Sequence, residues 1–139
     1  MLYATWTAAL FSAMLLSGCS GHRSLNDDEL KSAATEIISI ASEGELFATV
    51  AAEDHAPAKY VKSHPEYLRK EATDIAKELA QGQPELDAKP RFDQLRHAVK
   101  HLVDTLDALP ASPGDPHWQQ SQSELNDIRS EAERIRQTF

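Results

Sequence analysis

The chain has 139 residues, of which 26% are charged and 41% hydrophobic, and its formal net charge is -8. This length suits one domain with or without a targeting segment, and it excludes a TIM barrel or a complete dinucleotide-binding enzyme. The acidic balance argues against nucleic acid as a partner, because phosphates need a basic surface, and the single cysteine excludes an internal disulfide framework and cysteine-rich metal sites.

The first nineteen residues contain no charged side chain, whereas all 14 Lys and Arg and all 22 Asp and Glu follow Cys19. The apolar run from Ala4 to Leu16 has the length of the hydrophobic region of an export signal. It is short for a membrane span, which needs roughly 20 apolar residues. No basic residue precedes Ala4, so either translation starts upstream or export relies on the terminal amine. The alternative is a buried apolar helix that carries an ordinary core cysteine.

The apolar run ends in Leu-Ser-Gly-Cys at residues 16–19. This motif resembles the lipobox of bacterial lipoproteins. The resemblance implies a diacylglycerol on the Cys19 sulfur, cleavage before Cys19 and, in many bacteria, a third acyl chain on the new amino terminus. Ser20 in place of Asp implies sorting to the outer membrane, with the domain in the periplasm. The expected division is a signal peptide at 1–18, a lipidated cysteine and tether at 19–26, and a helical domain at 27–139.

The first helix of the domain is predicted to begin at Asp27 and to run to about Asp54. Asp27 is a favourable cap, and acidic residues in the first turn suit the positive end of the helix dipole. Gly44 is predicted to be a weak point, because glycine costs roughly 1 kcal/mol in a helix interior. Apolar or small residues recur at a spacing of three or four: Leu30, Ala34, Ile37, Ala41, Gly44, Ala48 and Ala51.

The second helix is predicted to start at Ser63, because Ser63 and Glu66 have the spacing of a capping box and proline is tolerated in a first turn. Before it, residues 58–62 form at most a short helical segment after Pro57. The helix is expected to end before Gly82, where Gly82-Gln83-Pro84 has the composition of a turn. Its apolar positions are Leu68, Ala72, Ile75 and Leu79.

Two further helices are expected, from about Ala88 to Pro110 and from an Asp115-Pro116 start to Phe139. No segment shows the alternation of a strand. The sequence therefore predicts an all-α fold, an antiparallel up-down four-helix bundle. The alternatives are a three-helix bundle with the first helix extended away, and an intermolecular coiled coil. The two apolar stripes are Phe92, Leu95, Val99, Leu102, Leu106 and Leu109, and Trp118, Ser121, Leu125, Ile128, Ala132, Ile135 and Phe139.

His97, His101 and Asp93 are the candidate metal ligands. Residues four apart share a helix face, and two imidazoles with a carboxylate could hold Zn²⁺, Cu²⁺ or Ni²⁺. This face points away from the apolar stripe, so it is expected to be solvent-exposed, without groups that orient the rings. Asp104 lies on the same face. A plain polar surface is the alternative interpretation.

His64 lies on the apolar stripe of the second helix and is expected to be partly buried. It is interpreted either as a metal, haem or pH-sensitive residue, or as a structural histidine bonded to a backbone carbonyl. Tyr60 and Tyr67 lie at the edge of the same stripe and are the candidate interaction surface, because tyrosine is enriched at binding hot spots. Trp118 is instead predicted to belong to the core.

These observations favour a non-enzymatic, lipid-anchored helical protein of the cell envelope, which binds an unknown envelope partner. No cofactor is expected beyond the covalent lipid. The alternative is a metal- or small-ligand-binding bundle that uses His97 and His101, or His64. No glycine-rich phosphate loop, nucleophile elbow or His-Glu-x-x-His motif is present, and nothing favours a Ser-His-Asp triad. The acidic residues are interpreted as ordinary surface charges rather than paired catalytic carboxylates: Glu43, Glu45, Glu53 and Asp54.

Overall fold

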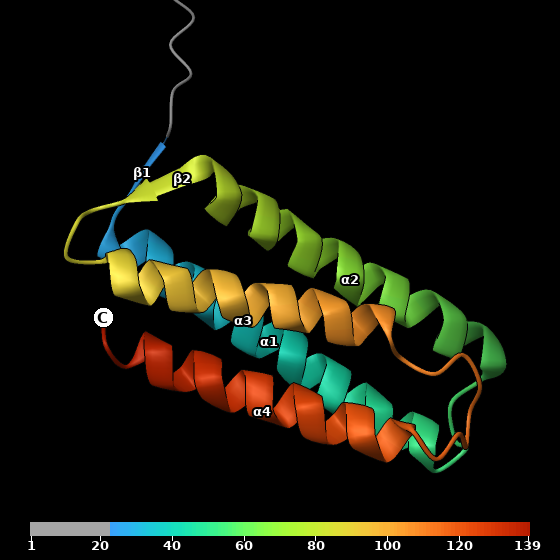
Figure 1. Ribbon diagram of the computed structural model, residues 1–139. Helices are drawn as coiled ribbons and strands as arrows, with labels where there is room; N and C mark the ends of the chain where they lie inside the picture. Colours follow the sequence, from blue (N-terminus) through green and yellow to red (C-terminus); the bar gives the residue numbers. More distant parts are fainter. Residues whose placement is uncertain (1–22) are drawn as a thin grey trace, which may run out of the picture.

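The computed structural model describes residues 23–139, which form four helices and two short strands (Figure 1). The predicted signal peptide and Cys19 lie outside the described residues. The chain is therefore mainly helical, as the sequence predicts, but it also contains two strands that the sequence did not predict. In chain order the elements are β1 (Arg23–Leu25), α1 (Asp27–Ala52), α2 (Ala58–Gln81), β2 (Gly82–Pro84), α3 (Lys89–Asp107) and α4 (Trp118–Arg136).

The two strands pair in parallel, with Arg23 opposite Gly82 and Leu25 opposite Pro84. Two expectations are corrected by this pairing. The last part of the predicted tether, residues 23–25, is a strand with a buried leucine, and the predicted turn at 82–84 is its partner. A strand of three residues is too short to show the period-2 alternation by which sequence reveals strands.

The ends of the helices gather at two ends of the structure. The connections from α1 to α2 and from α3 to α4 lie at one end, on the right in Figure 1. The strands, the connection from β2 to α3 and the C-terminus lie at the other end. Within residues 23–139, none of the helices is long and apolar enough to cross a membrane.

Helix α1 is capped one residue earlier than predicted. The Asn26 side chain accepts a hydrogen bond from the Glu29 backbone N–H at 3.0 Å, and the Glu29 carboxylate accepts one from the Asn26 N–H at 3.0 Å. This reciprocal capping box satisfies two N–H groups that the helix itself leaves free. The predicted cap, Asp27, is instead the first residue of the helix.

Helix α2 begins at Ala58 and runs through Pro65, so the predicted start at Ser63 is wrong. The proline lacks the N–H that would bond the carbonyl four residues earlier. Tertiary packing compensates, because Ala56 and Val61 are buried on either side of the helix start. The helix consequently gains a first turn that carries Tyr60.

Helices α3 and α4 are both shorter than predicted. Helix α3 ends at Asp107, three residues before Pro110, and α4 starts at Trp118. The predicted cap residue Asp115 accepts a hydrogen bond from the His117 backbone N–H at 2.9 Å, just ahead of the helix. Trp118 is fully buried, which confirms its predicted place in the core, and its Nε1 donates to the Ser112 carbonyl at 2.8 Å.

The predicted stripes of all four helices form a single hydrophobic core, with Leu109 and Phe139 packed at its margin. Helix α1 packs most extensively against α4 and much less against α2. Gly44 explains the close α1–α4 approach, since a Cβ atom there would lie only 3.2 Å from Leu125 Cδ1. The predicted weak point is thus a packing position, and the looser α1–α2 seam remains hollowed.

Candidate interaction face between α1 and α2

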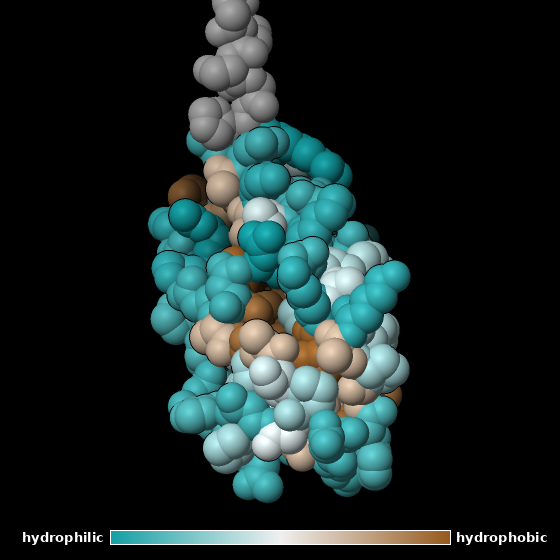
Figure 2. Space-filling model, turned by 90° about the vertical axis from the view of Figure 1, so that its right-hand side faces the viewer, coloured by the Kyte–Doolittle hydropathy of each residue, from teal (hydrophilic) through white to brown (hydrophobic). Residues whose placement is uncertain are grey.

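Exposed apolar side chains concentrate on α1 and on α2. Five large hydrophobic residues are exposed within the described part of the chain, and only Leu86 lies elsewhere. The face on the right-hand side of Figure 1 is largely hydrophilic, with some hydrophobic side chains exposed near its middle (Figure 2). Exposed apolar side chains that lie together are typical of binding sites. The four residues on α1 and α2 are Leu46, Val50, Tyr60 and Tyr67.

The two candidate tyrosines lie on either side of His64. The Tyr60 and His64 ring centroids are 4.6 Å apart and the His64 and Tyr67 centroids 6.2 Å apart, both in stacked orientations. Phe47 of α1 lies against this row, 5.4 Å from Tyr60 and edge-on to it. Phe47 also contacts Trp118 at 5.5 Å, which connects the exposed tyrosines to the buried core. Tyr60 therefore packs against both His64 and Phe47, and Tyr67 packs against His64.

His64 is partly buried, as its place on the stripe predicts, with a side chain 12% exposed. Its Nε2 lies 3.1 Å from Oε1 of Glu43 on α1. The expected backbone carbonyl is therefore not the recorded partner of the ring. The histidine and the glutamate join the two helices across the seam.

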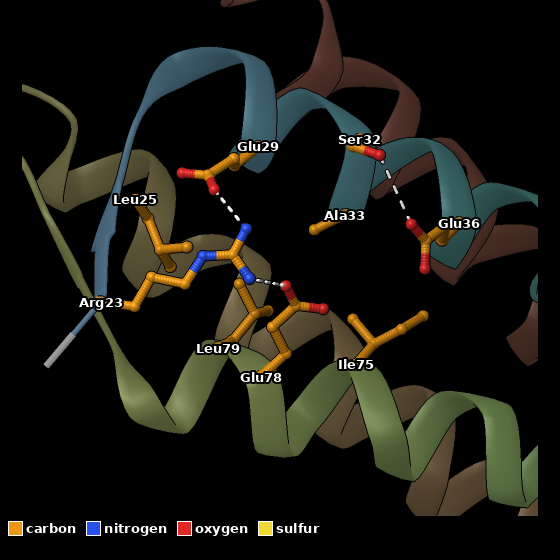
Figure 3. A pocket seen from close by; sticks show the side chains of 9 residues that line it. All are labelled: Arg23, Leu25, Glu29, Ser32, Ala33, Glu36, Ile75, Glu78 and Leu79. Carbon is orange, nitrogen blue, oxygen red and sulfur yellow. Dashed lines mark hydrogen bonds and ion pairs between the residues drawn. The ribbon is translucent and has the colours of Figure 1, made fainter. Parts of the chain in front are cut away.

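A second cross-seam contact lies at the strand end of the same two helices (Figure 3). Arg23 of β1 places its guanidinium between Glu29 of α1 and Glu78 of α2. Its Nη1 donates to Glu78 Oε1 at 3.1 Å, and its Nη2 donates to Glu29 Oε1. The arginine adjoins a hollow of about 120 Å³, whose apolar lining includes Ala33 and Leu79.

The charges of this contact stabilise one another. The pKa of Glu29 lies below its ordinary value because the Asn26 N–H donates to its carboxylate and because Arg23 donates to it as well. The pKa of Arg23 is raised, chiefly by its hydrogen bond and its attraction to Glu29. Opposite charges within a few ångströms favour the charged forms of both partners.

Between these two contacts the seam is open. A hollow of about 260 Å³ lies there, and it shares Glu36 and Ile75 with the hollow beside Arg23. Ile40 and Leu68 also line it, beside Tyr67. We call this continuous depression the α1–α2 groove. The carboxylates around its middle are those of Glu36, Glu43 and Glu71.

The acidic residues of the groove follow a heptad spacing. Glu29, Glu36 and Glu43 are seven residues apart on α1, and Glu71 and Glu78 are seven apart on α2. Residues seven apart lie almost on one line along a helix, with a drift of about 20° per heptad. Sequence reasoning missed this groove, although the spacing was readable. The role of Arg23 was not readable, because its partner Glu78 is 55 residues away.

The candidate metal ligands are not brought together. Within residues 23–139 no group of three or more His, Cys, Asp or Glu side chains is arranged to hold a metal ion. His97 and Asp93 line a shallow hollow between α2 and α3, and His101 does not. The Asp93 carboxylate instead pairs with Lys89 Nζ at 2.8 Å. The expectation that this face is exposed is confirmed.

The acidic residues near the end of α1 point to different partners. Glu43 faces His64 of α2, Glu45 pairs with Arg129 of α4 at 3.1 Å, and Glu53 contacts His55. They are thus separate contacts rather than one pair of carboxylates around a pocket.

A scan against protein-family models, a search of curated proteins and a search of solved structures found no match to this chain.

Proposed function

We propose that this chain is a lipid-anchored, non-enzymatic interaction module of the bacterial cell envelope, and that the α1–α2 face binds its partner. The observation that carries the proposal is the concentration of exposed Leu46, Val50, Tyr60 and Tyr67 on two neighbouring helices, beside a groove. Aromatic side chains that are held by packing and remain exposed are well suited to be binding hot spots.

Helix order supports this assignment. We infer that the fold is the antiparallel up-down bundle, because the chain connections alternate between the two ends of the structure (Figure 1). In this arrangement α1 and α2 are antiparallel neighbours, and side chains link them at the strand end through Arg23 and further along through His64 and Glu43. Short connections between successive helices favour the same arrangement.

The anchor gives the module an orientation. The lipobox resemblance places lipid on Cys19, and three acyl chains would hold the protein permanently, since two already give stable anchoring. Only three residues separate Cys19 from Arg23 of β1. Fully extended, that connection spans at most about 14 Å. The strand end of the bundle would therefore face the membrane from which it is anchored, in the periplasm and at the outer membrane.

The exposed apolar residues then lie on the half of the molecule that is farther from the membrane. Leu46 is nineteen residues along α1 from Asp27. At 1.5 Å per residue this corresponds to about 28 Å. A face at this height is accessible to another envelope protein without any movement of the bundle.

Cell fractionation tests the anchored part of the proposal. We expect wild-type protein in the outer-membrane fraction, and Cys19→Ser in the soluble or unprocessed fraction. Mass measurement of the amino-terminal peptide identifies the lipid directly. Ser17→Ala is a matched control, since it keeps a small residue in the motif and should leave processing intact. An unmodified Cys19 in wild-type protein would contradict the anchor.

Paired substitutions test the binding part. Tyr60→Ser with Tyr67→Ser should abolish complex formation in membranes crosslinked with a general lysine-reactive reagent, while the protein still folds and is still lipidated. His97→Ser with His101→Ser is the control on an exposed face of α3. Loss of the complex in both pairs, or in neither, would contradict the α1–α2 assignment.

A further inference from the structure

We propose that the middle of the α1–α2 groove binds an arginine or lysine side chain from an amphipathic segment of the partner, between Glu36 and Glu71. This inference rests on the proposed function, because it specifies the chemistry of the partner at the same face. It goes further in that it assigns a charge, a position and a shape to the bound segment.

The chain itself shows how a cation fits this groove. At the strand end the Arg23 guanidinium lies between Glu29 of α1 and Glu78 of α2 and bonds to both (Figure 3). Glu36 is seven residues after Glu29 on α1, and Glu71 is seven residues before Glu78 on α2, so both lie farther from the strand end. They therefore repeat the arrangement two helical turns away from Arg23, with the groove between them hollow rather than filled.

Arg23 bonds to both helices at the strand end, and among the described residues no cation joins Glu36 to Glu71 in the same way. Glu43 has His64 as its partner, and Glu29 and Glu78 have Arg23. Among residues 23–139, no cation lies within ion-pair distance of Glu36, whose recorded contact is the Ser32 hydroxyl at 3.4 Å. Lys70 is 3.8 Å from Glu71 but bonds to Asp74 at 3.0 Å. A cation between the two helices at this level would gain the attraction of Glu36, which has no ion-pair partner among the described residues, in addition to that of Glu71.

Apolar surface defines the rest of the bound segment. Ile40, Leu68 and Ile75 line the hollow beneath the carboxylates. Tyr67 borders the hollow and is 54% exposed, and Leu46 is 66% exposed. Leu46 follows Glu43 by one helical turn on α1. The stem of an arginine or lysine can lie along apolar surface while its charged end reaches a carboxylate.

The occupant is therefore an amphipathic protein segment. Its cation enters the middle of the groove, and its apolar side chains cover the exposed residues beside it. The volume of about 260 Å³ suits one side chain and is below the usual size of a small-molecule site. Lipid is a poorer fit, because the bordering carboxylates would repel anionic headgroups.

A defined peptide tests this inference. The probe is a fluorescein-labelled helical 14-residue peptide with leucine and alanine on one face and one arginine at its centre. The protein is the mature chain from residue 19 with Cys19→Ser, which retains the whole core from Leu25 to Ile135. A cooperative melt is checked first for every variant. Fluorescence anisotropy then gives the dissociation constant.

We expect Glu36→Gln with Glu71→Gln to weaken binding at least tenfold. The matched control is Asp87→Asn with Asp127→Asn, which makes the same change in net charge at exposed positions outside the groove and should change affinity less than twofold. A second peptide replaces arginine with citrulline, which keeps the shape and removes the charge. The citrulline peptide should bind the wild type at least tenfold more weakly than the arginine peptide does. It should bind the Glu36→Gln, Glu71→Gln variant no more weakly than the arginine peptide does.

The outcomes distinguish a failure of the cation-binding inference from a failure of the proposed function. A loss confined to the groove variant and to the arginine peptide supports the inference. Equal losses in the groove and control variants would show attraction by net charge alone and would overturn it. Absence of binding at millimolar peptide would overturn it as well. In both negative cases, crosslinking through Tyr67 in cells still shows whether the face binds a partner of other chemistry.

Discussion

The Leu25 side chain lies directly over the Gly82 backbone, so close that a Cβ atom on Gly82 would be 2.1 Å from Leu25 Cδ1. This approach pairs β1 with β2 and places Arg23 in the groove between α1 and α2. Because Cys19 is four residues before Arg23, the same contact would determine how the anchored end of the chain is attached to the bundle.

Gly82→Ala should therefore destabilise the protein. The new methyl group must displace the leucine, including its Cγ at 2.6 Å, and overpacking of this kind typically costs about 1–3 kcal/mol. Urea unfolding measures the loss. The neighbouring Gln83 is exposed, so Gln83→Ala is the control and should cost less than about 0.5 kcal/mol. Equal stability of the Gly82→Ala variant and the wild type would contradict this view of the β1–β2 contact.

A second glycine joins the α3–α4 connection to the end of α1. Gly114 has a φ of 72°, and its N–H donates to the Ala51 carbonyl at 2.8 Å. Gly114→Ala should cost about 1–2 kcal/mol, because an L-residue is strained in this conformation. Thermal unfolding measures the loss of stability. Ser112→Ala is the control, because Ser112 is exposed and bonds to Trp118 through its backbone carbonyl, which alanine keeps. Equal melting temperatures for Gly114→Ala, Ser112→Ala and the wild type would contradict this role of Gly114.

Acid should reduce the free energy of unfolding, because several carboxylates have a lowered pKa in the folded protein. The pKa values of Glu29, Asp74 and Asp115 lie below their ordinary values because of hydrogen bonds, first from Asn26, Lys70 and His117 respectively. A lowered pKa means that the unfolded chain binds protons more readily, so stability is present above about pH 4.5 and is lost as the pH falls further. Urea midpoints between pH 7 and pH 2.5 measure this loss.

Glu29→Gln should flatten that acid loss without removing it, since two other carboxylates remain. Arg23→Gln should flatten it as well, because it removes one of the donors to Glu29. Lys31→Gln is the control on the same helix, with no ion pair recorded within the described residues. A pH profile that is the same in all four proteins would contradict the assignment.

Metal ions should not stabilise this protein through His97 and His101. A ligand present at 100 times its dissociation constant would add about 2.7 kcal/mol to the free energy of unfolding. We expect Zn²⁺, Cu²⁺ and Ni²⁺ to leave the melting temperature within about 1 °C of the metal-free value, which is below the shift expected for 1 kcal/mol. A rise that is lost in His97→Ala with His101→Ala would instead establish the metal-binding alternative.

The core was predictable because helical periodicity is a long, redundant signal. Every predicted stripe residue of α1, from Leu30 to Ala51, is buried, and Trp118 is in the core as expected. The helix starts were less predictable, since a capping box at Ser63 competes with burial of Val61, four residues after Pro57. The helix begins at Ala58, because packing of Val61 in the core favours the longer helix.

The candidate site was only partly predictable from sequence. Tyr60 and Tyr67 were identified at the edge of one apolar stripe and His64 on that stripe, and the structure stacks the three rings together. The groove was not identified, because it is formed by two helices whose relative rotation no local pattern encodes. Arg23 was assigned to a tether for the same reason, as its role depends on a strand pairing with residues nearly sixty positions away.

Site-specific photocrosslinking in living cells tests the central claim, that the α1–α2 face of the anchored protein binds an envelope partner. A photoreactive phenylalanine analogue would replace Tyr67 or Leu46 on this face, and His101 or Asp127 on α3 and α4 as controls. We predict one crosslinked species from positions 67 and 46, absent from 101 and 127 and lost in Cys19→Ser. Crosslinks of equal yield from all four positions, or from the controls alone, would contradict the account.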